Sequence, residues 1–431
     1  MSTKNLSIVV SKKDLDLIVG RASLAAMTEE GQNEITKATN ETMGCVKISA
    51  ENGQIVFESS VSRFSSRYVI TVGEGDSAIV SEGETCVPAK ELKTVSGKIR
   101  SDRKISISFV PVSSETAGNM SASEKAVLPD GVVEIGSISG SKVVSKTKIE
   151  AYPAARFASP SYPPVDSLKV VASGKVGFFK KACATVNFAV NPSDLKEIYD
   201  KFAFFTAEDG IYFVGSDGRR CAIVKASGDK FTSYMNVSND VPILADAVFI
   251  SPALSSMSDD AQMTMGLDQD EERLYICSGD TSYCINMVEK LLRAKYPNHK
   301  RITNLPTKVE VLINRDEFSE TMDILGIVNS DRGTYTFDQD GKEEQMITLV
   351  GRGIGTVKET TGSVGYSLIS QEKMNSASIS LNTKYLSEGI KRMSCENIRM
   401  SFTEDELKVK IEEENNSEFV YFMQVTHSQE A

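Results

Sequence analysis

One alternation of apolar and polar positions occurs three times along the chain. Each copy has a short alternating strand, a tight turn with glycine and a second strand; a helix and another strand follow about 40 residues later. The turns lie 157 (53 to 210) and 131 (210 to 341) residues apart, at Ala50–Gly53, Ala207–Gly210 and Gln339–Gly341. The helices repeat at offsets of 162 and 132 residues, marked by Leu92, Leu254 and Leu386. Two independent markers therefore predict three homologous modules in tandem.

The predicted modules cover residues 1–172, 173–307 and 308–431. Each combines two helices with short alternating strands, so the predicted fold class is α+β, with helices packed on one face of antiparallel sheets. Residues 112–142 interrupt the first module and are rich in Ser, Gly and Ala. We expect an inserted flexible loop there.

Capping residues and apolar periodicity place the helices. Ser11 is predicted to cap a helix over Lys12–Met27, and Asn314 to cap one in module 3. Asn382 or Thr383 caps the last helix. The remaining helices are expected at Lys90–Arg100, Phe178–Asn187, Ser251–Met257 and Lys384–Met393.

Composition narrows the class of protein. With 431 residues, 40% hydrophobic and 25% charged, the chain has the length of two to four globular domains. No apolar run approaches the ~18 residues of a membrane span, and no signal-peptide pattern begins the chain, so we expect a cytoplasmic protein without a membrane partner. The seven cysteines form no CxxC pair, and only His299 and His427 are histidines. We therefore expect reduced thiols, no metal site and no cofactor.

An enzyme is one alternative. Asp217 beside Arg219 and Arg220 could form a catalytic acid with an anion clamp. An aspartate that hydrogen-bonds its own turn is the better interpretation of that motif. The chain has no Walker lysine loop, GxSxG or HExxH motif. We therefore predict a protein without enzymatic activity.

Four segments match one family in order and spacing. They are Val87–Lys90, Gly215–Cys221 (Gly-Ser-Asp-Gly-Arg-Arg-Cys), Tyr296–Arg301 (Tyr-Pro-Asn-His-Lys-Arg) and Ser394–Met400. Together with the triple module they make nearly the whole chain resemble the bacterial sliding clamp, the β subunit of DNA polymerase III. No single motif is specific alone, but the combined order is. We interpret the chain as a divergent member of this family, with a phage or mobile-element origin as a hypothesis.

The resemblance implies a head-to-tail homodimer whose six modules close a ring around double-stranded DNA, with helices lining the hole. The net charge of −11 by itself argues against nucleic acid, but basic residues on the helices would attract phosphates without reading sequence. The candidate DNA-binding residues are Lys12, Lys13, Arg21, Lys90, Lys93, Lys98, Arg100, Lys180, Lys181, Lys384, Lys391 and Arg392.

Two observations weigh against this lining. The helix Ser251–Met257 has no basic residue, and the helix over Arg315–Ile324 is acidic. For any one lysine, an ordinary solvated helix face is the simpler interpretation. The set as a whole favours the lining.

The resemblance also implies an apolar cleft between modules 2 and 3 that binds short peptide motifs of DNA polymerase and the clamp loader. The matching positions are Ser216, Gly218, Arg219, Arg220, Cys221, Pro252, Gln424, Val425 and Thr426. The family ends in Met-Pro-Met-Arg-Leu, whereas this chain has Gln-Val-Thr-His over residues 424–427, and a cysteine replaces the family's leucine at position 221. The lost apolar area predicts weaker or altered peptide binding. The alternative is a plain hairpin loop with exposed arginines.

Two further architectures compete with this one. A repeat scaffold that serves as a protein-interaction hub without DNA would share the modules, but it would not need lysines on helices of all three. A clamp of the eukaryotic type has two modules per chain and closes as a trimer. Three modules predict a dimer instead.

Overall fold

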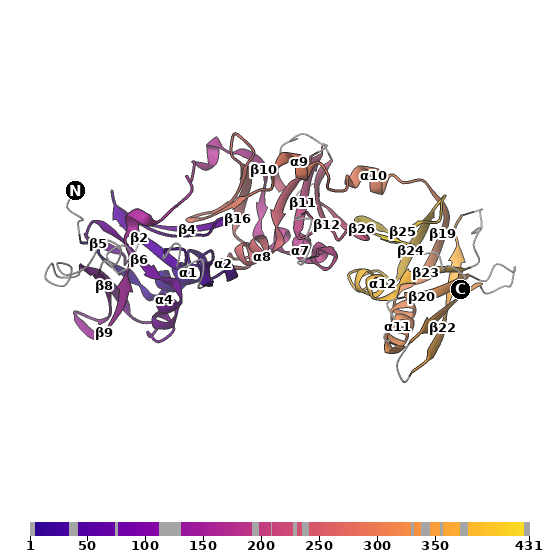
Figure 1. Ribbon diagram of the computed structural model, residues 1–431, viewed down its shortest axis with the longest axis horizontal. Helices are drawn as coiled ribbons and strands as arrows, with labels where there is room; N and C mark the ends of the chain where they lie inside the picture. Colours follow the sequence, from indigo (N-terminus) through magenta and orange to yellow (C-terminus); the bar gives the residue numbers. More distant parts are fainter. Residues whose placement is uncertain are drawn as a thin grey trace. The chain divides into compact units, whose positions relative to one another are not determined.

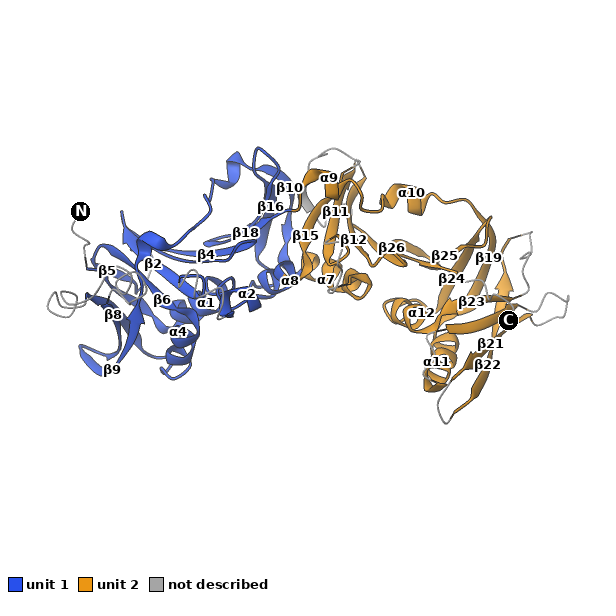
Figure 2. Cartoon of the chain, viewed as in Figure 1, with its two compact units in different colours: residues 1–177, 249–287 blue, residues 178–248, 288–431 orange. Residues whose placement is uncertain are grey.

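The computed structural model describes residues 5–33, 42–73, 76–111, 131–191, 198–207, 209–226, 231–234, 241–328, 332–337, 345–353, 357–370 and 378–425. The chain divides into two compact units (Figure 2). Unit 1 comprises residues 1–177 and 249–287, and unit 2 comprises residues 178–248 and 288–431. This division falls inside the predicted module 2, part of which packs in each unit. The three-module boundaries stay a prediction.

The elements of unit 1 include three helices, α1 (Lys12–Arg21), α2 (Glu29–Gln32) and α4 (Ala89–Ser96), among its described residues. Its strands are β1 (Ser7–Ser11), β2 (Cys45–Glu51), β3 (Gln54–Ser60), β4 (Phe64–Thr71), β5 (Ala78–Ser81), β6 (Gly83–Pro88), β7 (Lys104–Pro111), β8 (Gly131–Ser139), β9 (Lys142–Ala151), β10 (Lys169–Lys175), β16 (Gln262–Leu267), β17 (Arg273–Ser278) and β18 (Thr281–Asn286). Two helices cross the division between the units, α7 (Val176–Val186) and α8 (Ala247–Ser255).

The elements of unit 2 include the helices α9 (Lys290–Arg293), α10 (His299–Thr303), α11 (Arg315–Leu325) and α12 (Thr383–Ile390). Its strands are β11 (Lys201–Ala207), β12 (Gly210–Ser216), β13 (Arg220–Ala226), β14 (Phe231–Tyr234), β15 (Ile243–Asp246), β19 (Thr307–Asn314), β20 (Arg332–Phe337), β21 (Gln345–Arg352), β22 (Glu359–Leu368), β23 (Ser378–Asn382), β24 (Asn397–Thr403), β25 (Lys408–Glu413) and β26 (Asn416–Gln424).

Unit 1 places its helices against antiparallel sheets (Figure 1). One sheet has the strand order β5-β1-β7-β8-β9, and in the other the strands of unit 1 follow the order β10-β16-β17-β18-β4-β3-β2-β6. Leu15 and Ile18 of α1 and Leu92 of α4 are buried with Phe57 of β3 in one core. Apolar residues at every second position give each strand an apolar face, and apolar residues at helical spacing give each helix an apolar stripe that packs on it.

Buried serine hydroxyls fasten the end of α1 to the sheet of unit 1. Ser59 and Ser66 donate to the Ala22 carbonyl at 2.5 and 2.9 Å. The same hydroxyls accept from the backbone N–H groups of Ala26 and Ala25 at 3.2 and 3.3 Å. Backbone groups at a buried helix end need such partners, because water cannot reach them.

Unit 2 is organised by a twelve-stranded sheet with the order β15-β11-β12-β13-β26-β25-β24-β19-β22-β21-β20-β23. The Asn314 side chain accepts from the N–H groups of Asp316 and Glu317, both at 3.1 Å, which confirms the predicted cap of α11. Asn382 accepts from the Tyr385 N–H at 2.9 Å, so Asn382 is the cap of α12.

In each unit, a strand pair joins parts of two predicted modules. β18 pairs antiparallel with β4 in unit 1, and β26 pairs antiparallel with β13 in unit 2. In both cases the last strand of one module continues the sheet of the module before it. Each pairing satisfies backbone groups that would otherwise form an open sheet edge.

Three expectations about local structure are wrong. Residues 131–142 of the expected loop belong mostly to strands β8 and β9, while residues 112–130 lie outside the described residues. The glycines of β8 reflect close strand contacts, because an added Cβ at Gly136 would overlap the Ser106 hydroxyl. Helix α1 ends at Arg21 rather than at Met27. Helix α8 begins at Ala247 and contains Pro252, and the Ser256 N–H still donates to the Pro252 carbonyl at 3.0 Å.

The first of the three predicted glycine turns has the expected backbone conformation. Asn52 (φ 52°) and Gly53 (φ 76°) adopt left-handed conformations, as a type I′ hairpin requires. Residues 339–341 and Glu208 lie outside the described residues. No helix in the described part of the chain has the length and apolar character needed to cross a bilayer.

Substitution of Gly389 tests the packing of α12. A Cβ at this position would overlap the ring of Tyr421, whose hydroxyl donates to the Tyr385 carbonyl at 2.9 Å. We expect Gly389→Ala to lower the free energy of unfolding by about 1–3 kcal/mol, measured by urea denaturation. Gly326 at the end of α11 has nothing within 4 Å of its Cβ position and serves as control. Equal stability of Gly389→Ala and Gly326→Ala would contradict this packing.

Candidate functional site

The predicted DNA-binding residues of unit 1 lie on or beside α1 and α4, which pack against each other (Figure 1). Lys13 on α1, Lys90 and Lys93 on α4, and Lys98 just beyond α4 are exposed. The buried residues of the same helices fix their solvent faces, since Leu15, Ile18 and Leu92 point into the core. These four lysines are the members of the unit 1 set with free access to a phosphate.

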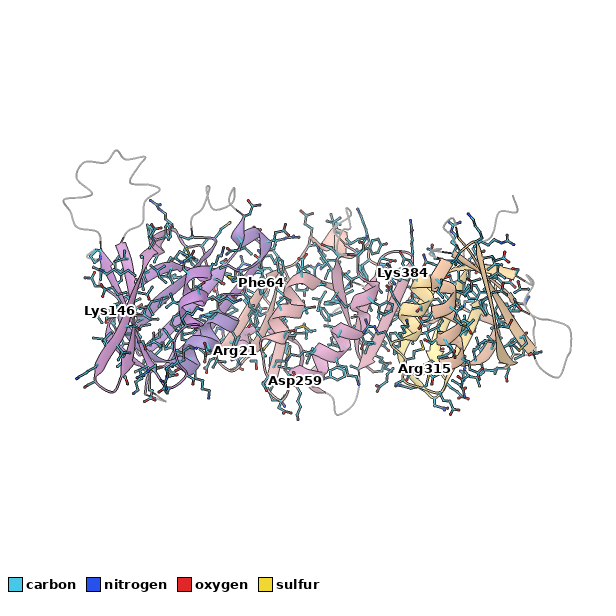
Figure 3. All side chains as sticks on the ribbon, turned by 90° about the horizontal axis from the view of Figure 1, so that it is seen from below. Arg21, Phe64, Lys146, Asp259, Arg315 and Lys384 are labelled. Atoms are coloured by element: carbon cyan, nitrogen blue, oxygen red, sulfur yellow. The ribbon has the colours of Figure 1, made fainter. Side chains whose placement is uncertain are left out.

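Three other predicted residues of unit 1 already have partners. Lys12 is buried and forms an ion pair with Asp16 one turn away. Arg21 (labelled in Figure 3) donates to the Thr281 hydroxyl at 3.1 Å and to the Ser256 carbonyl at 3.3 Å. Arg100 is exposed and pairs with Asp102 at 3.2 Å. Lys12 and Arg21 therefore have structural contacts that the sequence did not indicate.

The predicted DNA-binding residues of unit 2 lie on α7, on α12 and directly after α12. Lys181 and Lys384 are exposed, and Lys180 is half-buried (Lys384 is labelled in Figure 3). Lys391 pairs with Asp323 of α11 at 2.6 Å, and the Arg392 guanidinium lies 5.7 Å from the centre of the Phe188 ring.

Helix α11 carries the opposite charge on its solvent face. Its exposed side chains include Asp316, Glu317, Glu320 and Asp323. A phosphate backbone would be repelled by such a face. The candidate DNA-binding residues of unit 2 therefore do not include the solvent face of α11.

The predicted partner cleft centres on the loop between β12 and β13 in unit 2. The Ser216 hydroxyl donates to the Arg220 carbonyl at 2.8 Å and accepts from the Gly218 N–H at 3.1 Å. Gly218 has φ 84°, and its Cβ position lies 3.1 Å from the Tyr199 ring. The loop conformation therefore depends on glycine at position 218.

Strand β26 brings the end of the chain to this loop. The Gln424 N–H donates to the Arg219 carbonyl at 3.1 Å, and its side-chain amide donates to the Gly218 carbonyl at 3.4 Å. Val425 is buried beside it. The structure thus brings together the predicted residues Ser216, Gly218, Arg219, Arg220, Cys221, Gln424 and Val425. Pro252 lies inside α8 in unit 1, and Thr426 lies outside the described residues.

Asp217 organises the loop and is not free to act as an acid. Its carboxylate accepts from the N–H groups of Arg219 and Arg220 at 2.9 and 3.0 Å, and from the Arg220 side chain at 3.0 Å. The expected turn aspartate that bonds its own backbone is confirmed.

Arg220 is held in place from several directions and does not project from the loop. Its guanidinium forms an ion pair with Glu388 of α12 and lies 3.9 Å from the centre of the Tyr385 ring. Burial opposes the charged form, but Glu388, Tyr421 and Asp217 outweigh it and raise the pKa of Arg220. The expectation of an exposed arginine holds for Arg219 and is wrong for Arg220, which is only 9% exposed along its side chain.

An apolar cluster supports the loop from below. Cys221 packs with Phe205, Tyr296 and Phe422, and burial raises the pKa of its thiol to about 12. His299 lies between the rings of Phe205 and Tyr212, with centroid distances of 4.4 and 4.3 Å. Burial and the nearby Lys300 lower the pKa of His299 to about 4, so the imidazole is neutral at pH 7.

Several residues of this region were missed at the level of sequence. Tyr199, Tyr385 and Glu388 contact the loop or its arginine from distant parts of the chain. Their aromatic or acidic character gave no signal of this role. The pairing of β13 with β26 and the packing of α12 bring them there.

Comparisons with known proteins agree on one family. Residues 305–426 match the family described as DNA polymerase III beta subunit, C-terminal domain. The beta sliding clamp of Rickettsia felis is 20% identical over 426 residues, which cover 96% of this chain and 98% of that protein. A beta sliding clamp of Staphylococcus aureus is 21% identical over 228 residues, which cover 53% of this chain and 56% of that protein.

Solved structures share the fold along nearly the whole chain. The DNA polymerase III subunit beta of Pseudomonas aeruginosa has a TM-score of 0.74 at 13% identity and covers 98% of this chain and 100% of its own. The DNA polymerase III beta subunit of Thermotoga maritima has a TM-score of 0.72 at 14% identity, with coverage of 98% and 99%.

Arg220 and its neighbour Arg219 form a matched pair for mutation. Removal of the Arg220 guanidinium leaves the carboxylates of Asp217 and Glu388 without their partner in a half-buried site. We expect Arg220→Met to lower the free energy of unfolding by about 3 kcal/mol, measured by urea denaturation. Arg219→Met removes an exposed side chain and should leave stability within about 0.5 kcal/mol of wild type. If both variants behave alike, Arg220 does not hold the loop.

Proposed function

We propose that this chain, a divergent homologue of the bacterial β sliding clamp, acts as the processivity factor of a DNA polymerase in the cytoplasm. In this role a closed ring encircles duplex DNA and tethers the polymerase and other replication proteins. The single observation that carries the proposal is a likeness along the full length of the chain, in sequence to the Rickettsia felis clamp and in fold to solved clamps. The family is non-catalytic, and the bonded Asp217 fits that role. A phage origin stays a hypothesis.

Exposed lysines support contact with the DNA backbone. Lys13, Lys90, Lys93, Lys98, Lys181 and Lys384 lie on or beside helices and extend into solvent. Point charges on long side chains attract phosphates without fixing a register, which suits a protein that slides. In this proposal Lys12 and Arg21 stabilise the fold and do not bind DNA, because each already has a close partner within the protein.

A free sheet edge in unit 1 and exposed apolar side chains in unit 2 support the proposed head-to-tail homodimer. β9 ends its sheet in unit 1, with Val143 and Val144 exposed by 47% and 56%. In unit 2, Ile324 and Ile327 are exposed by 42% and 63% beside the acidic face of α11. Lys142, Lys146 and Lys148 make β9 basic (Lys146 is labelled in Figure 3). Both surfaces have an apolar centre, and the basic residues around β9 complement the acidic residues around α11. We therefore propose that β9 of one chain contacts the α11–β22 face of another.

The loop between β12 and β13 together with the end of β26 is the proposed site for polymerase and loader peptides. The polar side chain of Gln424 reduces the apolar contact area of this site. Arg220 is bound to Glu388 and does not face a ligand. The site therefore prefers other peptides than ordinary bacterial clamps do, or binds the same peptides less tightly. Tight binding of an ordinary clamp-binding peptide at this loop would contradict this preference.

Retention on DNA of different topology tests the ring. After loading onto nicked circular plasmid, we expect the protein to stay bound through gel filtration and to dissociate when the plasmid is linearised, because a ring slides off free ends. The measurement is the amount of protein that elutes with the DNA. Equal retention on circles and linear fragments would support a scaffold or an ordinary DNA-binding protein instead.

The lysines of α4 and its flank should dominate the salt dependence of duplex binding. For the triple variant Lys90→Gln/Lys93→Gln/Lys98→Gln, we expect weaker binding and a salt slope lower by about three, since each lost phosphate contact removes about one. Fluorescence anisotropy with a duplex at several salt concentrations measures this. Lys408→Gln on strand β25 is the control and should leave the slope unchanged. An unchanged salt slope in the triple variant would show that the lysines of α4 do not contact DNA.

Charged substitutions at the proposed interface should split the dimer. We expect a solution mass near 94 kDa for wild type, twice the 47.0 kDa chain, and 47.0 kDa for Val144→Asp or Ile327→Asp. We expect the dimer to dissociate because each substitution would bury an unpaired carboxylate in an apolar interface. Val80→Asp is the control, because Val80 is 68% exposed on β5, the opposite edge of the sheet that ends in β9. Light scattering after gel filtration gives the mass, and a wild-type monomer would exclude the closed ring.

A further inference from the structure

A cavity of about 260 Å³ lies in unit 1, where β18 continues the sheet of β4. Its walls come from the β3–β4 hairpin, from the segment Phe157–Pro160 and from the ends of β17 and β18. All of these belong to unit 1. The proposed function does not use this cavity.

The hydrogen bonds around this cavity repeat those of the loop between β12 and β13 in unit 2, which we call the partner loop. The Asn286 N–H donates to the Arg63 carbonyl at 2.9 Å, and its side-chain amide donates to the Ser62 carbonyl at 2.8 Å. Gln424 makes the same two bonds to Arg219 and Gly218. The two hairpins therefore correspond with an offset of 156 residues (63 to 219). The cavity therefore lies beside the hairpin of unit 1 that corresponds to the partner loop of unit 2.

The inward-facing residues of the two hairpins also correspond. Phe64 is paired with Ile285, as Arg220 is paired with Met423. Phe64 stacks on Phe249 of α8 at 5.0 Å (Phe64 is labelled in Figure 3), and Arg220 lies over Tyr385 of α12. An aromatic stack thus anchors the first hairpin where an ion-pair network anchors the second.

One residue difference between the repeats lies at this cavity. In unit 2 the ring of Tyr199 lies against Gly218. The same offset of 156 residues places Met43 at the corresponding position, and Met43 lines the cavity. The cavity of unit 1 is therefore lined by a flexible methionine at the position where unit 2 has a tyrosine ring.

The lining of the cavity favours an anionic group. Hydroxyls from Ser60, Ser62 and Ser159 and the amide of Asn286 line it, and Arg273 is the one ionisable side chain among its described lining residues. Ser60 bonds the Ser65 hydroxyl at 2.8 Å and Ser159 donates to the Pro160 carbonyl at 3.3 Å. The donors that suit a carboxylate are therefore the Ser62 hydroxyl, the second amide proton of Asn286 and the Arg273 guanidinium. The volume fits one or two side chains rather than a larger ligand.

We propose that this cavity is a second peptide-binding site, which takes a glutamate or aspartate of an extended partner segment. It is built from the same elements as the partner loop of unit 2, but it selects for acid through Arg273. A protein with both sites binds two classes of partner segment at once. This goes beyond the proposed function, which assigns partners to the loop in unit 2 alone.

The test uses the full-length protein and two libraries of capped, dye-labelled seven-residue peptides, one with glutamate and one with glutamine fixed at the centre. We expect the glutamate library to yield binders whose affinity, measured by anisotropy, falls at least tenfold for Arg273→Glu. The same fall is expected for Ser62→Trp, because Ser62 is exposed on the hairpin and an indole fills the mouth of the cavity. Arg219→Glu, on the loop between β12 and β13 of unit 2, should leave these peptides bound.

Each other result overturns the proposal. Binders that are lost only with Arg219→Glu belong to the loop of unit 2, and equal binding from the glutamine library removes the acid requirement. A glutamate library without binders leaves no site. Urea unfolding of each variant confirms that it is folded, and either Arg273→Glu or Ser62→Trp suffices for the comparison. Retention on circular DNA reports the proposed function separately, so the two can fail independently.

Discussion

The structure depends on antiparallel pairing between strands that belong to different repeats. A module that ended at its own last strand would expose a row of unpaired N–H and C=O groups. β18 closes the edge of β4 in unit 1, and β26 closes the edge of β13 in unit 2. The edge strand β9 has no such partner among the described strands of the chain. In the proposed homodimer a second chain covers this edge.

The same strand pairs fix the loops next to them. Asn286 and Gln424 each hold a hairpin through two hydrogen bonds to its carbonyls. Beneath one hairpin Phe64 needs only apolar neighbours, whereas Arg220 needs two carboxylates and an aromatic ring to offset the cost of its burial. Repeats of one geometry therefore carry different chemistry, and the sites built on them differ accordingly.

Segregation of charge reconciles an acidic chain with a proposed DNA ligand. The net charge is −11, yet the exposed residues of α4 and the turn after it include Lys90, Lys93 and Lys98. Helix α11 is acidic on its exposed face and lies beside exposed apolar residues. In the proposed assembly this helix faces a basic edge strand, so its acidity serves association between chains and does not oppose DNA binding.

The sequence by itself determined the features that depend on a few neighbouring residues. The caps at Ser11 and Asn314 and the Asn52–Gly53 turn occur where the pattern predicts them, because their hydrogen bonds and backbone angles are local. The resemblance carried by four short segments likewise predicted the fold that solved clamps confirm.

Only the tertiary structure decided features that depend on distant strands and helices. Strand β8 forms from a Gly- and Ser-rich segment because it pairs with β7 and β9, and Arg220 is withdrawn from solvent by Glu388, a partner that long-range packing supplies. The cavity beside Met43 was likewise hidden from sequence, since its walls come from segments more than 200 residues apart (43 to 286). Local preferences set what each segment can form, but long-range pairing decides which groups it buries and which it leaves free.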